Sequence, residues 1–384
     1  MLAAPAAAAR PGAAWLADLA GGPLPGRRHE DWRFTDLSPL AAIRPQLMAS
    51  RPAAMAVPLP AGVELLEPQA AAAALGQAIA TTGSAQHWPL RLNQAAIATD
   101  PSGALALRVH GAVTEPLVLA HALDAAGLAV RQLVLLLEPG SSLELLQVVH
   151  GCSNSQPGAA LSGLTAVHLG RGAHLRAGVL ALGGNSGASW LAHWLAVQEP
   201  ASRLSLTSAI GGWALARLEP RVVQLAGAAQ TLLRGLQVCS GAQISDTHSY
   251  VRFEGPDGSL DQLHKAVADG QARSVFNGAV QVPRPAQRTH AAQLSRNLLL
   301  SNRARIDTKP ELEIVADDVK CAHGATVSRL RDEELFYLQS RGISADQAAS
   351  LLKRAFCEEV LRELPAAAAG WDPLVQLLAQ DRSA

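Results

Sequence analysis

The order of apolar and polar residues divides the chain into three parts. From Pro11 to about Ala98 the sequence is rich in Ala and Pro, with helical periodicity at Ala13–Leu19 and Pro68–Ala80. Loops that contain Gly and Pro separate these pieces. We therefore expect a small, loosely helical N-terminal region over residues 1–100.

Between about Gly103 and Thr326 the pattern changes to short β-rich runs separated by Gly, Asn, Asp and Ser. Clear runs occur at Pro116–His121, Leu133–Leu137, Leu143–His150, Leu164–Leu169 and Val222–Leu225. Many short strands without crossover helices are typical of a sandwich, a barrel or a β-solenoid, and the succession of similar strand–turn units favours the solenoid. Residues 101–328 are predicted to form this mainly β core.

Helical signals return after Thr326, so residues 329–384 are predicted to form a C-terminal helical region. One helix is expected from Arg331 to Ser340, with Gly342 as its stop, and a second begins at Ser344 with a capping box completed by Gln347. A third helical segment follows Pro373. The second helix carries an apolar stripe that is expected to pack on the β core or to contact a partner, formed by Ala348, Leu351, Leu352, Ala355, Phe356 and Val360.

Composition excludes several classes of protein. The 384 residues are 49% hydrophobic, and the 32 basic and 32 acidic residues balance. A nucleic-acid-binding protein would show a basic surface with aromatic residues, so no nucleic acid is expected. The longest bulky aliphatic run, Leu133–Leu137, is too short to span a membrane. The first ten residues lack the features of a signal peptide and are interpreted as a frayed tail, which makes the cytoplasm the expected compartment.

Candidate metal chemistry lies in one short segment. Cys321 and His323 are separated by one residue, so on an extended strand both side chains point to the same face. A thiolate and an imidazole suit iron, zinc or copper(I), but two ligands make only half of a tetrahedral site. The remaining ligands must come from elsewhere, and a second chain is one source. Asp317 and Asp318 are interpreted as solvated charges on a strand edge.

The other candidate residues are assigned to structure. Twelve histidines are dispersed along the chain, and His248 and His264 stand out only because acidic residues are near them in sequence. The cysteines outside the Cys321 segment lack a partner at ligand spacing and are interpreted as structural: Cys152, Cys239 and Cys357. No Gly-x-x-x-x-Gly-Lys-Ser/Thr loop is present, so the chain is not expected to hydrolyse ATP.

Four segments resemble the SufB/SufD family of iron–sulphur cluster assembly proteins. They are Lys309–Thr326, Ser274–Val282, Glu334–Ile343 and the N-terminal stretch Arg28–Asp36. The likeness is strongest from about Gln262 to Leu361. It implies a right-handed parallel β-helix for the core and a scaffold that is not itself an enzyme. The chain has only four cysteines and no Cys-x-x-Cys, which favours the SufD branch of the family.

The resemblance also implies partners and site residues. A SufB-like paralogue would pair with the chain through β-helix edge strands, a SufC-like ATPase would dock on the C-terminal helices, and the isolated chain could form a homodimer. His323 is the candidate cluster ligand at the paralogue interface, and Cys321 is the weaker candidate. The chain alone is expected to bind no cofactor stably, because iron or a cluster would be held transiently in the complex. The expected docking surface contains Leu335, Phe336, Tyr337, Arg341 and Phe356.

Two alternative functions stay open from the sequence. The chain could be the principal, SufB-like cluster scaffold, against which the low cysteine count argues. It could also be a β-solenoid enzyme, a polysaccharide lyase or an acyltransferase, with His323 and either Asp317 or Asp318 as acid and base. Regular hexapeptide repeats and a polar catalytic cluster would favour the enzyme, and the sequence shows neither.

Overall fold

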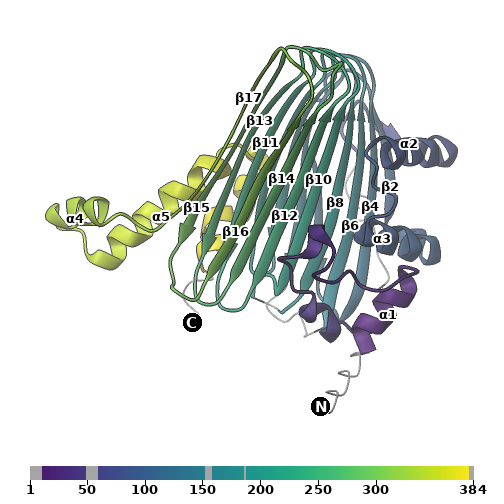
Figure 1. The fold of residues 1–384 in the computed structure, drawn as a ribbon. Coiled ribbons are helices and arrows are strands. Elements are labelled where there is room, and N and C mark those ends of the chain that lie inside the picture. Colours follow the sequence, from purple (N-terminus) through teal and green to yellow (C-terminus); the bar gives the residue numbers. More distant parts are fainter. Residues whose placement is uncertain (1–10, 49–58, 152–157, 186, 380–384) are drawn as a thin grey trace, which may run out of the picture.

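The computed structural model describes residues 11–48, 59–151, 158–185 and 187–379. In these residues the strands form a parallel β-solenoid built from two facing sheets (Figure 1). The nine-stranded sheet contains, in spatial order, β1 (Val63–Leu65), β2 (Ala104–Val109), β4 (Gly127–Leu137), β6 (Ala159–Leu169), β8 (Ser189–Gln198), β10 (Leu215–Gln224), β12 (Ile244–Phe253), β14 (Arg273–Val282) and β16 (Arg305–Ile314). The eight-stranded sheet contains β17 (Val319–Ser328), β15 (Thr289–Leu299), β13 (Ser259–Ala268), β11 (Gln230–Cys239), β9 (Arg203–Gly211), β7 (His174–Leu182), β5 (Ser142–Gly151) and β3 (Leu117–Leu123).

From β2 to β15, each strand pairs in parallel with the strand two places further along the chain. Leu215 of β10 is in register with Ile244 of β12, which is in register with Arg273 of β14 and then with Arg305 of β16. The chain therefore alternates between the two sheets as it advances. The prediction of a mainly β solenoid with helical regions at both ends is confirmed.

The alternation of side chains along β8 explains how the solenoid is filled. Trp190 and Trp194 point inward and belong to the main core, whereas Leu191 and Leu195 point outward into clusters shared with the N-terminal helices. All ten residues of β8 are buried because the helices cover its outer face. At the corners, glycine allows turns to stack closely: a Cβ on Gly270, whose φ is +63°, would lie 2.9 Å from the backbone nitrogen of Gly241 in the previous turn.

The interior changes from apolar to polar along the solenoid. Trp190, Trp194 and Trp213 fill the middle turns, and Trp190 stacks on Trp213 with ring centroids 6.3 Å apart. Later turns carry buried polar side chains at inward positions instead, namely Gln237, Thr247, Ser249, Gln262, His264, Gln293, Ser295 and Asn297. Hydrogen bonds between neighbouring turns satisfy many of these groups, as polar burial requires.

The N-terminal helices cover the outer face of the nine-stranded sheet (Figure 1). They are α1 (Pro11–Leu19), α2 (Pro68–Thr81) and α3 (Trp88–Thr99), with short 3₁₀ turns at Glu30–Trp32, Ser38–Ala42 and Pro101–Gly103. The helices expected at Ala13–Leu19 and Pro68–Ala80 correspond to α1 and α2. The sequence analysis did not identify α3. It lies against β4, β6 and β8, where buried Asn93 donates hydrogen bonds to the carbonyl oxygens of Arg131 and Ser162.

The C-terminal helices lie on the opposite side of the solenoid (Figure 1). They are α4 (Asp332–Ser340), α5 (Ala345–Leu361) and α6 (Pro373–Leu378), with a 3₁₀ turn at Ala366–Trp371. The capping box of Ser344 and Gln347 is present. Cys357, Val360 and Leu377 pack on the eight-stranded sheet, whereas α4 projects away from the solenoid and contains no buried residue.

The expected apolar stripe of α5 is only partly correct. Ala348 and Val360 are buried and Phe356 is half-buried, but Leu351 and Ala355 are exposed. Leu351 lies in the first turns of α5, which lie beside α4 and do not reach the solenoid, and Ala355 lies on the face of the helix turned away from Cys357, which packs on the solenoid.

Two of the structural cysteines lie in the described residues. Cys239 and Cys357 are buried, and burial raises the pKa of Cys239 to about 12. Cys152 and the first ten residues lie outside the described part of the chain. No helix among the described residues combines the length and the apolar character that crossing a bilayer requires.

Candidate functional site

The last turn of the solenoid presents two open strand edges. In the described residues, β16 and β17 end their sheets and no further strand pairs with their outer edges. Ile314, Val315 and Val327 are exposed apolar residues of this turn and the loop between its strands. Unpaired backbone groups beside exposed apolar side chains are the features of a surface on which another strand can pair.

Cys321 and His323 both lie on β17, so the expected extended segment is correct. Cys321 is in register with Ala291 and His323 with Gln293, and both of these β15 residues are buried inward-facing positions. Cys321 packs partly on the main core, while His323 is exposed because no turn follows. Asp317 and Asp318 lie in the bend before β17 and not on a strand, which corrects the expected placement. These two residues form the bend that joins β16 to β17, so neither of them belongs to a strand.

The two candidate ligands differ in chemistry. Partial burial raises the pKa of Cys321, and a hydrogen bond with the backbone of Ala291 opposes that effect. Because the thiolate is the metal-binding form, the raised pKa makes Cys321 the weaker of the two candidate ligands at neutral pH. In the described part of the chain, no third His, Cys, Asp or Glu completes a site with Cys321 and His323. Within the described residues the pair therefore offers at most two ligands to a metal.

A column of polar side chains runs inward beneath His323. Gln293 donates a hydrogen bond of 2.9 Å to Gln262, and Gln262 donates one of 2.7 Å to Ser249. Register places His323, Gln293 and Gln262 on successive strands of one sheet. The exposed imidazole is therefore the outermost member of a polar row that begins inside the solenoid.

The expected docking residues lie on α4, the turn after it and α5. Phe336 and Tyr337 are 73% and 58% exposed, and the Arg341 guanidinium lies over the Tyr337 ring at 5.4 Å from its centroid. Leu335 is half-buried between the helices. Phe356 is also half-buried, because the Lys265 ammonium lies 3.8 Å from its ring centroid. The exposed part of this set is Phe336 and Tyr337 in the middle of α4, together with Arg341 just after it.

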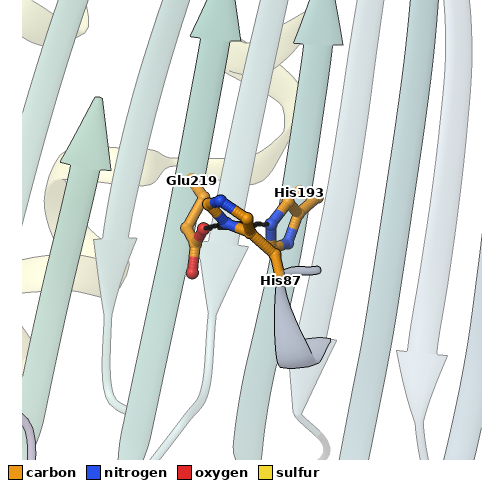
Figure 2. A group of neighbouring side chains, drawn as sticks. All are labelled: His87, His193 and Glu219. Carbon is orange, nitrogen blue, oxygen red and sulfur yellow. Dashed lines mark hydrogen bonds and ion pairs between the residues drawn. The ribbon is translucent and has the colours of Figure 1, made fainter. Parts of the chain in front are cut away.

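A second polar cluster, not foreseen from the sequence, lies between α3 and the nine-stranded sheet (Figure 2). His193 on β8 and Glu219 on β10 are adjacent in register, and both point outward beneath the start of α3, where His87 is the N-cap residue. The Glu219 Oε2 atom lies 2.8 Å from His87 Nδ1 and 2.9 Å from His193 Nε2. The two histidine nitrogens are 3.4 Å apart.

An arginine connects this cluster to a buried aspartate. Arg217 donates a hydrogen bond of 2.7 Å from Nε to Glu219 Oε1 and forms an ion pair with Asp246. Burial tends to raise the pKa of Glu219, but the Arg217 charge and His193 outweigh it and hold that pKa well below the usual value. Burial also lowers the pKa of His193, against the attraction of Glu219. The carboxylate is thus ionised while the buried imidazole is kept neutral.

The N-terminal segment Arg28–Asp36 closes over the same region. The Arg217 guanidinium lies 3.8 Å from the centroid of the Trp32 ring and donates a hydrogen bond of 2.9 Å to the Asp31 carbonyl oxygen. Thr35 donates a hydrogen bond to Asp246. His248, which the sequence analysis assigned to structure, lies 3.2 Å from the same Asp246 carboxylate. Sequence separations of more than a hundred residues explain why no local pattern indicated this cluster.

The chain was then compared with known proteins. A family model described as the SufBD core domain of the SUF system for FeS cluster assembly matches residues 121–356. The chain belongs to the SufBD family. The match includes His323, Cys321 and all of α4, as well as β8 and β10 with His193 and Glu219. His87 precedes it.

Relatives of this SufBD protein are found in bacteria and in a plant. An iron–sulphur cluster assembly SufBD family protein of Synechocystis is 47% identical over 166 residues, 43% of this chain and 37% of the relative. Protein ABCI7, chloroplastic, of Arabidopsis thaliana is 42% identical over 169 residues, 44% and 36% of the two chains. Iron–sulphur cluster assembly protein SufD of Escherichia coli is 37% identical over 171 residues, 44% and 40%. The matches therefore span 36–40% of the length of these relatives.

Proposed function

We propose that this SufBD protein is a SufD-like scaffold subunit in iron–sulphur cluster assembly, and not an enzyme. Its last turn would pair with the last turn of a SufB-like paralogue, and His323 would supply one ligand to iron or to a nascent cluster held at that interface. The observation that carries this proposal is the position of His323. It is an exposed imidazole on an edge strand with one unpaired side, and the described residues supply at most one further ligand, Cys321.

The chemistry of the pair supports a shared and transient site. Neutral imidazole binds iron well, and thiolates from a partner would complete its coordination. Cys321 would be the second, weaker ligand of this chain, because its raised pKa disfavours the thiolate at neutral pH. A site whose ligands are divided between two chains holds its cargo only while the chains are joined. Iron or a cluster is therefore substrate here and not a resident cofactor.

A SufC-like ATPase would dock on the C-terminal helices. Phe336 and Tyr337 are large, exposed aromatic side chains on a helix that has no other covering in the described residues, and Arg341 is held over Tyr337. Aromatic residues with a neighbouring arginine are typical of the centres of protein interfaces. The helix α5 connects this surface to the solenoid through Cys357 and Val360. ATP-dependent movement of a docked ATPase would thus reach β9 and β11 through α5, and the last turn through the three-residue link from β17 to α4.

The first test is anaerobic co-expression of the tagged chain with a SufB-like and a SufC-like protein, followed by sizing and by iron and sulphide analysis. His323→Ala should leave the three-chain complex intact but lower its cluster content several-fold. His290→Ala, which removes an exposed histidine from the adjacent strand β15, is the matched control. Normal cluster loading in the His323→Ala complex would refute the ligand role.

The docking surface has its own test. Phe336→Ala should weaken ATPase binding by about 2 kcal/mol, or roughly thirtyfold in Kd, if Phe336 is a central contact. Leu65→Ala is the control, because Leu65 is 60% exposed on β1, near the other end of the solenoid. Equal ATPase affinity in the Phe336→Ala variant and the wild type would place the ATPase elsewhere.

A further inference from the structure

The cluster of His87, His193 and Glu219 has the geometry of a metal site (Figure 2). The three potential ligand atoms form a triangle with sides of 2.8, 2.9 and 3.4 Å. Ions such as Zn²⁺ lie about 2.0–2.2 Å from nitrogen and oxygen ligands. Three atoms at these separations can all lie at that distance from one ion, which would sit just outside the plane of their triangle.

The ligand types select the class of metal. Two imidazoles and one carboxylate form a borderline set that suits Zn²⁺ and Fe²⁺ better than Ca²⁺ or Mg²⁺, which prefer oxygen ligands. Glu219 presents Oε2 to both histidines while its other oxygen accepts the hydrogen bond from Arg217. An outer hydrogen bond of this kind fixes the orientation of a ligating carboxylate.

Two pockets reach the His87 and Glu219 corners of the triangle, while His193 is buried. A pocket of about 280 Å³ is lined by His87 and Glu219 together with acidic Glu30, Asp31 and Glu311 and basic Arg217 and Arg221. A second pocket of about 370 Å³ is also lined by His87, Glu219 and Asp31. Arg217 is already paired with Glu219 and Asp246. Glu30 and Glu311 are likewise paired with Lys309, so the charges of the first pocket largely balance, and its volume leaves room for a water ligand beside His87 and Glu219.

The position of the cluster indicates what a bound ion would do. His193 and Glu219 belong to the solenoid, whereas His87 belongs to the N-terminal helical region. We propose that His87, His193 and Glu219 bind one Zn²⁺ or Fe²⁺ ion, which fastens the N-terminal helical region to the solenoid. This site is separate from the last turn and does not depend on the proposed assembly function.

The test uses the full chain, stripped of metal with a chelator and kept anaerobic. Zn²⁺ titration by calorimetry should give one site per chain, and Co²⁺ should give the visible d–d bands of a low-coordinate nitrogen–oxygen site. His87→Ala and Glu219→Gln should each weaken this binding by roughly a hundredfold or more, because one of three protein ligands is lost. Saturating Zn²⁺ should also slow proteolysis of the N-terminal region in the wild type but not in His87→Ala.

Two controls separate this site from other histidines. His168→Ala removes a histidine that lies 3.0 Å from Glu199 on the same sheet, in a pair without a second imidazole, and should bind Zn²⁺ normally. The double variant Cys321→Ser/His323→Ala should also bind normally, which excludes the last turn.

The outcomes decide the proposal without reference to cluster assembly. If the folded His87→Ala variant binds Zn²⁺ as tightly as the wild type, or if only the double variant loses binding, the proposal is wrong. Should Glu219→Gln unfold, His87→Ala decides alone, since the His87 side chain is 20% exposed and its loss leaves both buried ion pairs of Arg217, with Glu219 and with Asp246, in place.

Discussion

Replacing His264 by leucine should make the protein more resistant to acid. His264 points into the solenoid, where its ring stacks on Phe276 with centroids 4.2 Å apart. Neither ring nitrogen has a hydrogen-bond partner among the described residues. Burial lowers the pKa of His264 to about 3, so the folded protein keeps this imidazole neutral. In the unfolded chain the same group takes up a proton near pH 6.5.

This difference fixes the sign and the size of the effect. Above pH 6.5 the histidine is neutral in both states and contributes no pH dependence. As the pH falls from 6.5 towards 3, only the unfolded chain is protonated, and the free energy of unfolding drops by about 1.4 kcal/mol per pH unit for this group. At pH 5.0 the loss is about 2 kcal/mol, and His264→Leu should escape it.

The assay is urea unfolding of both proteins at pH 7.5, 6.0 and 5.0, followed by the fluorescence of the seven tryptophans. Each transition is fitted separately, because solenoids can unfold in more than one step. The difference between variant and wild type should grow by about 2 kcal/mol between pH 7.5 and 5.0. Other buried histidines are present in both proteins and cancel. A difference that stays constant with pH would refute the reasoning, because it would mean that His264 is hydrated or charged in the folded solenoid.

Three further substitutions test how the parts of the molecule are joined. Glu359→Gln removes the carboxylate that lies 2.6 Å from the buried Lys265 ammonium, and should lower the free energy that holds α5 on the solenoid by about 1 kcal/mol. The expected result is faster proteolysis after β17, and an unchanged cleavage rate would contradict it. Gly183→Ala places a Cβ 2.3 Å from the Gly212 carbonyl oxygen and should cost about 1–3 kcal/mol in thermal unfolding; an equal midpoint would mean that this turn can shift. Asn93→Ala removes two hydrogen bonds to strand carbonyls and should cost about 1–3 kcal/mol, with faster amide exchange in α3 unless water replaces the amide.

Local sequence signals account for the elements that were predicted. The helix stop at Gly342 and the capping box of Ser344 and Gln347 depend on residues within one turn of each other, and both are present. The short β-rich runs correspond to strands because alternation and turn residues are also local. The sequence therefore predicted the solenoid region and the C-terminal helices α4 and α5 well.

The elements that were missed depend on tertiary packing. The helix α3 has buried polar Asn93 on the face that contacts the sheet, so its apolar pattern is interrupted, and its partners exist only once β4 and β6 are in place. His193 lies 106 residues and Glu219 lies 132 residues after His87 along the chain. The register between stacked turns decides which distant residues become neighbours on adjacent strands, as His193 and Glu219 do. A short stretch of sequence does not contain the information that fixes this register. The shared strand of Cys321 and His323 could be predicted, because two residues separated by one position point to the same face of any β-strand.

The two ends of the solenoid differ, and this limits how copies of the chain can assemble. Among the described residues, the first end closes the nine-stranded sheet with the short antiparallel strand β1 and leaves β3 as the edge of the other sheet, whereas at the last turn both sheets end on ten-residue parallel strands whose outer edges are unpaired. Two copies that join through their last turns use up both pairs of bare edges, so a twofold contact of this kind closes on itself. Self-association through this end should therefore stop at a dimer, while a solenoid with identical open ends would grow into a fibre. Any partner strand that covers the last turn competes directly with that dimer.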